Sequence, residues 1–109
     1  MSFYNSEYIE PNALGYTIYT KSNCIYCTKA KEFFDNKKDI DLIINCDGYI
    51  SKNKEAFLAF IKNKAGREYR TFPMIFHDGK FVGGFTELKP YYDKMNAFLC
   101  FENENLHVL

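Results

Sequence analysis

Strand-like and helix-like segments alternate along this chain of 109 residues, and their order restricts the folds that it can adopt. Runs rich in β-branched and aromatic residues predict four strands, at residues 16–20, 41–46, 72–77 and 80–82. Apolar residues that recur every three or four positions predict three helices, at residues 24–36, 51–65 and 86–101. The element order is therefore β-α-β-α-β-β-α, which predicts an α/β fold in which helices flank a mixed four-stranded sheet.

Two connections set the directions of the strands. The first two strands are joined through a helix, so we expect them to be parallel, with a right-handed crossover. Asp78-Gly79 is a strong signal for a tight hairpin, so we expect the last two strands to be antiparallel. Asp47-Gly48 predicts a turn after the second strand.

The chain divides into an N-terminal lead-in, one folded domain and a loose C-terminal tail, at residues 1–15, 16–101 and 102–109.

Charge and hydropathy argue against two classes of partner. Lys+Arg and Asp+Glu both total 14, so the chain has no basic surplus with which to bind nucleic acid. No apolar run approaches the roughly 18–20 residues of a membrane span, and residues 1–8 lack the pattern of a secretory signal. We expect no nucleic-acid or membrane partner, and a monomeric chain.

The cysteine content indicates a reducing compartment, which we take to be the cytoplasm. The four cysteines are too few and too unevenly spread for a secreted disulfide scaffold; they are Cys24, Cys27, Cys46 and Cys100. The pair three residues apart is then either catalytic or metal-binding. Zinc needs two more ligands at matched spacing, and His77 and His107 are isolated, so no metal is expected. The two lone cysteines are interpreted as passive buried thiols.

The position of the pair between a predicted strand and a predicted helix favours redox chemistry. Cys24 lies at the helix N-terminus, where unpaired N–H groups and the helix dipole favour the thiolate, which is the nucleophile in disulfide exchange. Lys21 adds a cation nearby. Cys27, one turn further on, is placed to attack a mixed disulfide formed on Cys24. From the residues alone, a structural or incidental cysteine pair stays open as an alternative.

Three segments resemble the motifs of dithiol glutaredoxins. Residues 19–27 (YTKSNCIYC) resemble the active-site segment Y-T-K-x-x-C-P-Y-C of that family. Residues 71–73 (TFP) resemble its T-V-P segment, and residues 83–87 (GGFTE) resemble its G-G-C-[DS]-D segment. The segments occur in the order and spacing of the family, and the resemblance extends over residues 16–99.

The resemblance implies a thioredoxin-like fold and glutathione-dependent thiol–disulfide exchange through the two cysteines, with Pro73 in the cis form. It implies that Lys21 binds the glycine carboxylate of glutathione, that Gly84 lets the ligand come close, and that Glu87 pairs with the ligand amine. The implied glutathione-binding residues are Lys21, Tyr26, Thr71, Phe72, Pro73, Gly84, Thr86 and Glu87. The implied substrates are disulfide-containing and glutathionylated proteins, with ribonucleotide reductase as a family-level candidate.

Several departures from the family pattern keep other functions open. Ile25 replaces the usual proline, which leaves open a carrier of a glutathione-ligated [2Fe-2S] cluster. Phe85 replaces a frequent cysteine, and Arg70 is only a candidate for a further ligand contact. A thioredoxin-type protein-disulfide reductase would share the fold, but it usually carries a tryptophan beside its cysteines and this chain has none. A partner-binding domain without activity is disfavoured by the intact cysteine pair.

Overall fold

The computed structural model describes residues 7–35, 37 and 40–108, and it leaves aside the side chains of residues 41 and 98–108. Its elements are β1 (Tyr16–Thr20), α1 (Ile25–Phe33), β2 (Ile40–Asn45), α2 (Asp47–Ala65), β3 (Met74–His77), β4 (Lys80–Gly83) and α3 (Phe85–Val108). The predicted order β-α-β-α-β-β-α is confirmed. Within the described residues no helix combines the length and the apolar character needed to cross a membrane.

The four strands form one mixed sheet in the order β2-β1-β3-β4. β1 is parallel to β2, and β3 is antiparallel to both β1 and β4, which confirms the predicted strand directions. The hairpin between β3 and β4 turns through Asp78 and Gly79, both at positive φ (52° and 80°). Because β3 inserts beside β1, the strand that leads to the cysteine pair lies inside the sheet and is buried along its whole length.

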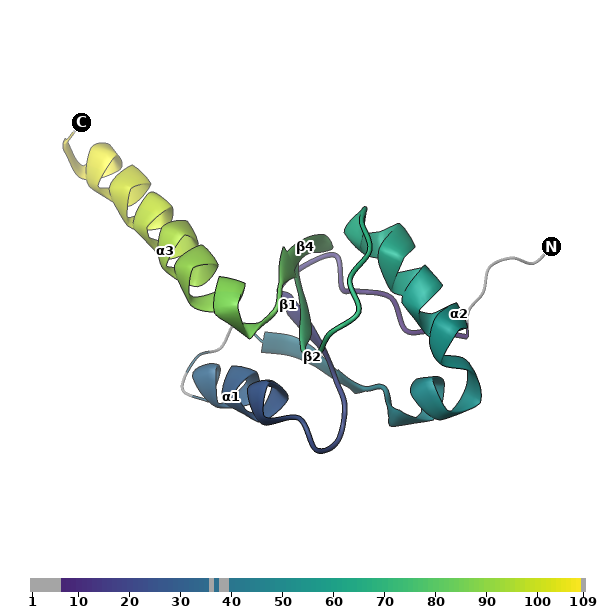
Figure 1. Ribbon diagram of the computed structural model, residues 1–109. Helices are drawn as coiled ribbons and strands as arrows, with labels where there is room; N and C mark the ends of the chain where they lie inside the picture. Colours follow the sequence, from purple (N-terminus) through teal and green to yellow (C-terminus); the bar gives the residue numbers. More distant parts are fainter. Residues whose placement is uncertain (1–6, 36, 38–39, 109) are drawn as a thin grey trace.

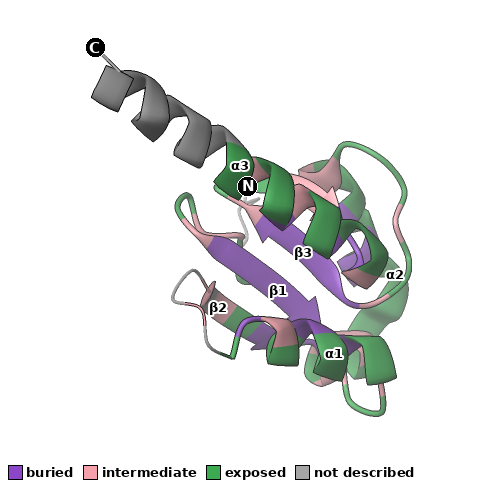
Figure 2. Cartoon of the chain, turned by 90° about the vertical axis from the view of Figure 1, so that its left-hand side faces the viewer, coloured by how far each residue is buried: buried purple, intermediate pink, exposed green. Residues whose placement is uncertain are grey.

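Helices cover both faces of the sheet (Figure 1). Figure 2 shows the two central strands buried between them, while the outer surfaces of the helices are exposed. The core beneath α2 contains Tyr19, Ile44, Cys46, Phe57, Leu58, Ile61, Met74 and Phe76. The core beneath α1 and α3 contains Tyr16, Ile18, Ala30, Phe34, Ile75, Leu88 and Tyr92. Neighbouring residues of β1 and β3 thus alternate between the two cores, as the two-residue repeat of a strand requires.

α1 is shorter than the predicted helix over residues 24–36. Cys24 is its N-cap residue, and Phe34 ends it with an N–H that donates to the carbonyl of Lys31 at 3.1 Å. This three-residue spacing is the tight turn with which helices commonly end. Asn36, the predicted last residue, lies outside the described residues.

α2 begins at Asp47, so the turn predicted at Asp47-Gly48 is wrong. Cys46 is the N-cap residue, with no side-chain capping hydrogen bond to the described residues of the helix, and the side-chain oxygen of the preceding Asn45 accepts a hydrogen bond from the Asp47 N–H at 2.9 Å. The helix thus starts directly after the strand. The helix is kinked at Asn53 (φ −166°, ψ 90°). The Asn53 side chain accepts from the Ala56 N–H at 3.1 Å, so it caps the second part of the helix.

α3 extends to Val108, beyond the end predicted at residue 101, so the tail predicted to be loose is helical through that residue. Figure 1 shows the far end of α3 projecting away from the sheet. The near end contributes the buried Leu88 and Tyr92 to the core. The start of α3, which follows directly on β4, faces the cysteine pair through the cleft described below.

Candidate active site

Cys24 and Cys27 lie at the start of α1 and are joined by a disulfide, with their Cα atoms 5.2 Å apart. Cys24 is the N-cap residue, with an extended backbone (φ −131°, ψ 104°). The backbone N–H of Cys27 donates to the Cys24 sulfur at 3.2 Å. In the reduced protein the same N–H and the positive end of the helix favour an anionic sulfur on Cys24.

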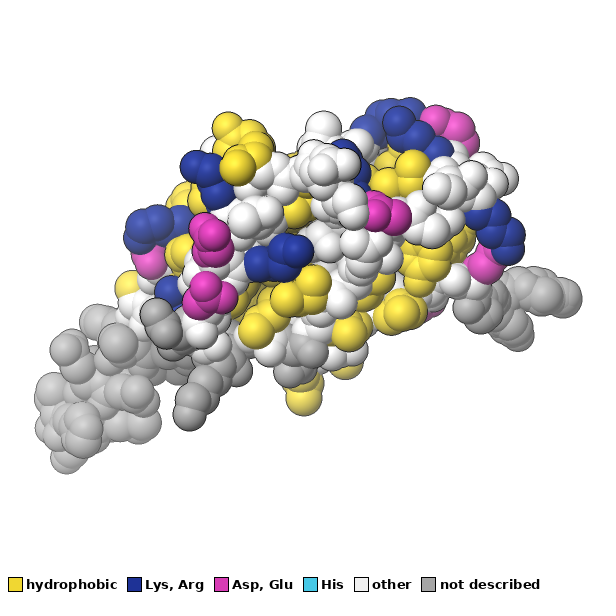
Figure 3. All heavy atoms as spheres, turned by 90° about the horizontal axis from the view of Figure 1, so that it is seen from below, with side chains coloured by type: hydrophobic (Ala, Val, Ile, Leu, Met, Phe, Trp, Pro, Cys, Tyr) yellow, Lys and Arg dark blue, Asp and Glu magenta, His cyan; other side chains and the backbone are white. Residues whose placement is uncertain are grey.

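The two cysteines differ in accessibility. Cys27 is only 1% exposed and belongs to the buried residues, whereas Cys24 is half-buried. Next to it, Ile25 and Tyr26 are 65% and 53% exposed. Figure 3 views the molecule from below and shows hydrophobic side chains exposed among charged ones on this face. An incoming disulfide therefore meets the Cys24 sulfur first.

A cleft of about 230 Å³ lies beside the cysteine pair, whose sulfurs are not part of its described lining but whose neighbours Tyr26 and Phe72 are. Its lining residues are Tyr26, Tyr69, Thr71, Phe72, Pro73, Gly84, Phe85, Thr86 and Glu87. The structure thus brings together all the expected glutathione-binding residues except Lys21. It adds Tyr69 and Phe85, which were not expected to bind ligand.

Residues Thr71 to Pro73 form the floor of the cleft nearest to the reactive sulfur. The Phe72–Pro73 peptide bond is cis, as the resemblance implied. The carbonyl oxygen of Phe72 lies 3.7 Å from the Cys24 sulfur, and Pro73 is buried. The backbone of this segment is therefore next to any group attached to Cys24.

The opposite wall of the cleft is the start of α3. The Glu87 carboxylate accepts a hydrogen bond from the Gly84 N–H at 2.8 Å, and the Glu87 N–H donates to the Gly84 carbonyl at 3.2 Å. This reciprocal pair resembles a capping box, so Glu87 stabilises the helix start. Its pairing with a ligand amine stays a prediction.

Lys21 lies outside the cleft. It lines a separate pocket of about 380 Å³, together with Ser22, Asn23 and Asp47. Ser22 donates two hydrogen bonds to the Asp47 carboxylate, one from its hydroxyl and one from its N–H at 2.9 Å, and these lower the pKa of Asp47. Asp47 thereby fixes the loop before Cys24, a role that sequence reasoning missed because it interpreted this residue as part of a turn.

Arg70, the candidate for a further ligand contact, is also absent from the lining of the cleft. Its guanidinium forms ion pairs with Glu55 at 2.9 Å and with Glu68 at 3.3 Å. These carboxylates hold its charge on the exposed surface between α2 and β3. Among the described residues, no group of three or more His, Cys, Asp or Glu side chains is arranged to hold a metal ion.

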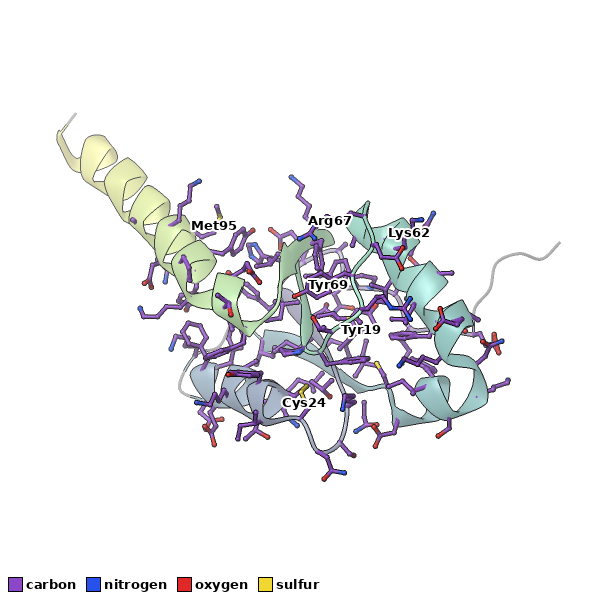
Figure 4. The ribbon with its side chains drawn as sticks, viewed as in Figure 1. Tyr19, Cys24, Lys62, Arg67, Tyr69 and Met95 are labelled. Carbon is purple, nitrogen blue, oxygen red and sulfur yellow. A yellow bond between two sulfur atoms is a disulfide. The ribbon has the colours of Figure 1, made fainter. Side chains whose placement is uncertain are left out.

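The two lining residues that were not expected are aromatic. Phe85 stacks on Tyr26, with ring centroids 6.0 Å apart, so these two rings form one wall. Tyr69 stands on the α2–β3 link (Figure 4). Tyr69 lies two residues before Thr71 in the sequence. No general sequence pattern connects a residue at that position with ligand binding, so its place in the cleft could not be predicted from the sequence.

A model of the glutaredoxin family matches residues 16–82 of the sequence. The chain belongs to the glutaredoxin family. Glutaredoxin 1 of Rickettsia typhi is 41% identical to it over 71 residues, which are 65% of this chain and 64% of that protein. Glutaredoxin 1 of Rickettsia prowazekii is 39% identical over 71 residues, or 65% of this chain and 70% of that protein. The match to the first relative thus spans slightly less than two thirds of its length.

Solved glutaredoxin structures share the fold. Glutaredoxin 1 from Francisella tularensis, crystallised in complex with cacodylate, has a TM-score of 0.56 and 34% identity, covering 75% of this chain and 95% of that one. Reduced Escherichia coli glutaredoxin has a TM-score of 0.54 and 27% identity, covering 72% of this chain and 93% of that one. The predicted thioredoxin-like fold of this glutaredoxin is therefore confirmed, with its C-x-x-C pair at the start of α1.

Proposed function

We propose that this chain is a glutathione-dependent thiol–disulfide oxidoreductase that reduces protein disulfides and glutathione mixed disulfides through Cys24 and Cys27. The observation that carries the proposal is the position of Cys24. Its accessible sulfur accepts a hydrogen bond from the Cys27 N–H at the start of α1. The sulfur also lies next to a cleft that is large enough to hold part of a small peptide. Family membership supports the same chemistry.

Reduction of a protein disulfide uses both cysteines. The Cys24 thiolate attacks one sulfur of the substrate, a Cys24–substrate disulfide forms, and the second substrate sulfur leaves as a thiolate that takes up a proton. The Cys27 thiolate then attacks the Cys24 sulfur, which releases the reduced substrate and forms the Cys24–Cys27 disulfide present in this structure. Two glutathione molecules reduce this bond and leave as oxidised glutathione.

Reduction of a glutathione mixed disulfide needs only the first cysteine. The Cys24 thiolate attacks the glutathione sulfur and releases the protein thiolate. A second glutathione thiolate attacks the same sulfur, which frees Cys24 and forms oxidised glutathione. Both routes therefore require Cys24, and only the first requires Cys27.

The cleft offers the groups that a glutathionyl moiety needs. The backbone beside Phe72 is placed to pair with an extended peptide as an added strand, a common mode of peptide recognition. The N–H groups at the start of α3 suit a carboxylate. Lys21 lies in the neighbouring pocket, and we propose that its flexible side chain reaches the glycine carboxylate when ligand binds.

The proposal is tested by glutathione-coupled reduction of two substrates, a glutathione mixed disulfide and a protein disulfide. Cys24→Ser should abolish turnover of both. Cys27→Ser should keep activity on the mixed disulfide and lose activity on the protein disulfide. Equal loss of both activities in Cys27→Ser would contradict the two roles, and efficient reduction by a thioredoxin reductase in place of glutathione would favour the thioredoxin-type alternative.

The proposed substrates are disulfide-containing and glutathionylated proteins, with ribonucleotide reductase as a family-level candidate. The proposed setting is a reducing compartment such as the cytoplasm, where a thiol reductant keeps the pair turning over. We propose that the chain acts as a monomer.

A further inference from the structure

Tyr69 places its hydroxyl directly over Gly84 in the cleft. A Cβ added to Gly84 would lie 2.6 Å from the Tyr69 oxygen, closer than real Cβ contacts come. The same position would lie 3.5 Å from the Pro73 carbonyl oxygen. The space left by the missing side chain of Gly84 is therefore taken by the Tyr69 hydroxyl, between the two walls of the cleft.

Other side chains pack against the ring of Tyr69, so the ring is fixed in place without a hydrogen bond from the Tyr69 hydroxyl. Phe81 packs edge-on against it, with ring centroids 4.8 Å apart. The Arg67 guanidinium lies 5.4 Å from the Tyr69 ring and 5.1 Å from the Phe81 ring, and Figure 4 shows Arg67 beside Tyr69. Aromatic and cation–π contacts of this kind orient a ring without using its polar end.

The Tyr69 hydroxyl makes no hydrogen bond to any residue that the structure describes. Other tyrosines differ: Tyr19 donates to the Ile9 carbonyl at 2.7 Å, and the Tyr91 oxygen lies 2.8 Å from a ring nitrogen of His77. A partly buried phenol normally finds a hydrogen-bond partner. A fixed hydroxyl that lines a cleft and lacks one is available to a ligand.

The charges that line the cleft limit the groups that could bind a ligand carboxylate there. The described lining contains no lysine or arginine, and its one carboxylate, Glu87, is engaged with the Gly84 N–H. A ligand carboxylate next to the Tyr69 hydroxyl must then rely on neutral donors. Four side chains of the described lining carry hydroxyls, namely Tyr26, Tyr69, Thr71 and Thr86, and the Tyr69 hydroxyl is the one that lies over Gly84.

We propose that Tyr69 is a substrate-binding residue whose hydroxyl donates a hydrogen bond to the γ-glutamyl carboxylate of the glutathionyl substrate. This inference rests on the proposed function, because it assigns the ligand of that same cleft. The hydrogen bond anchors the glutathionyl group in the cleft beside Cys24, and it favours thiols that carry a carboxylate at this position.

The test compares Tyr69→Phe with the wild type, using the mixed disulfide of glutathione with 2-mercaptoethanol at saturating glutathione. We expect KM for this probe to rise about fivefold with kcat unchanged, which corresponds to the loss of a solvent-accessible hydrogen bond worth about 1 kcal/mol. With the analogue whose γ-glutamyl carboxylate is an amide, the two proteins should differ by about twofold or less. Tyr91→Phe, which removes a hydroxyl bonded to His77, is the matched control and should match the wild type.

Three results overturn the assignment. If the wild type turns over the probe and Tyr69→Phe has the same KM, Tyr69 does not bind the ligand, while the proposed function stands. If the fivefold effect persists with the γ-glutamyl amide but disappears with a glycine amide, the hydroxyl binds the other carboxylate. If the wild type fails to turn over the probe, the proposed function fails and the Tyr69 assignment fails with it. Tyr69→Phe retains the ring, so its thermal unfolding midpoint should stay within about 1 °C of the wild type.

Discussion

The contact between Glu87 and Gly84 predicts that Glu87→Ala destabilises the whole domain. The Glu87 carboxylate accepts the Gly84 N–H at 2.8 Å, one of the N–H groups that have no partner within the helix. Pro90 lies one turn further on and has no N–H of its own, so the carbonyl of Thr86 loses its usual helical donor. The start of α3 therefore depends on this cap more than an ordinary helix does.

The magnitude follows from two losses. Removal of a capping side chain costs about 1 kcal/mol, and loss of a negative charge beside a helix N-terminus adds about 0.5 kcal/mol. The expected total for Glu87→Ala is about 1.5 kcal/mol. For a chain of 109 residues the entropy of unfolding is on the order of 0.23 kcal/mol/K, so the unfolding midpoint should fall by about 6.5 °C.

Thermal unfolding followed by circular dichroism measures this change, and two variants separate its parts. Glu87→Gln keeps an oxygen that can accept the Gly84 N–H and loses only the charge, so we expect a fall of about 2 °C. Asp93→Ala is the matched control, because it removes an acid from the same helix whose exposed ion pair with Lys89 contributes little. Its midpoint should fall by about 2 °C or less.

The reasoning is refuted if Glu87→Ala and Asp93→Ala lower the midpoint equally. It is also refuted if Glu87→Gln is as damaging as Glu87→Ala, because the charge alone would then account for the effect. The KM for a glutathionylated substrate, measured on the same variants, separates the cap from the expected pairing of Glu87 with the ligand amine. A variant that changes stability and leaves KM unchanged has lost only the cap.

Three further predictions concern residues around the site. Burial raises the pKa of the Cys46 thiol to about 12, and the side chain is 0% exposed, so the unfolded chain releases this proton from about pH 8.5 while the folded chain keeps it. Above pH 8.5 the free energy of unfolding should therefore fall with pH more steeply in the wild type than in Cys46→Ala, by up to about 1.4 kcal/mol per pH unit. Urea unfolding at several pH values measures this, and the same pH dependence in both proteins would contradict it. Gly83 has φ +136°, and a Cβ there would lie 2.8 Å from the Glu87 carboxylate. Gly83→Ala should therefore lower the free energy of unfolding, measured in urea, by about 1–3 kcal/mol. A decrease below about 0.5 kcal/mol would show that the turn accommodates a side chain. Arg70 is held by Glu55 and Glu68, so Arg70→Ala should leave KM for the glutathione probe unchanged, whereas a rise of about threefold or more would return Arg70 to the ligand site.

The sequence predicted most of the site because the chemistry of its parts is local. Cys24 was predicted to lie at a helix N-terminus because a strand pattern precedes it and a helix pattern follows it. Cys27 comes one turn later in that helix. Residues 71–73 and 83–87 were found through short motifs, and the structure brings both segments to one cleft. Lys21 was expected there by the same reasoning, but the loop anchored by Asp47 places it in the neighbouring pocket.

The role of Tyr69 could not be predicted, because it depends on contacts between distant segments. Its ring is positioned by Phe81 of β4 and its hydroxyl by the space over Gly84, neither of which is adjacent in the chain. The kink at Asn53 is another such case: an asparagine caps a helix only where the preceding backbone has already left the helical conformation.

Local patterns were sufficient for the element order, the parallel pair, the β3–β4 hairpin and the position of Cys24, because periodicity, turn residues and caps act over a few neighbouring residues. The tertiary structure decided that β3 inserts beside β1, and this pairing carries Pro73 and Phe72 against the Cys24 sulfur. It also decided that Cys27 is buried while Cys24 is accessible. Strand order and burial depend on which distant apolar surfaces pack together, and no short stretch of sequence contains that information.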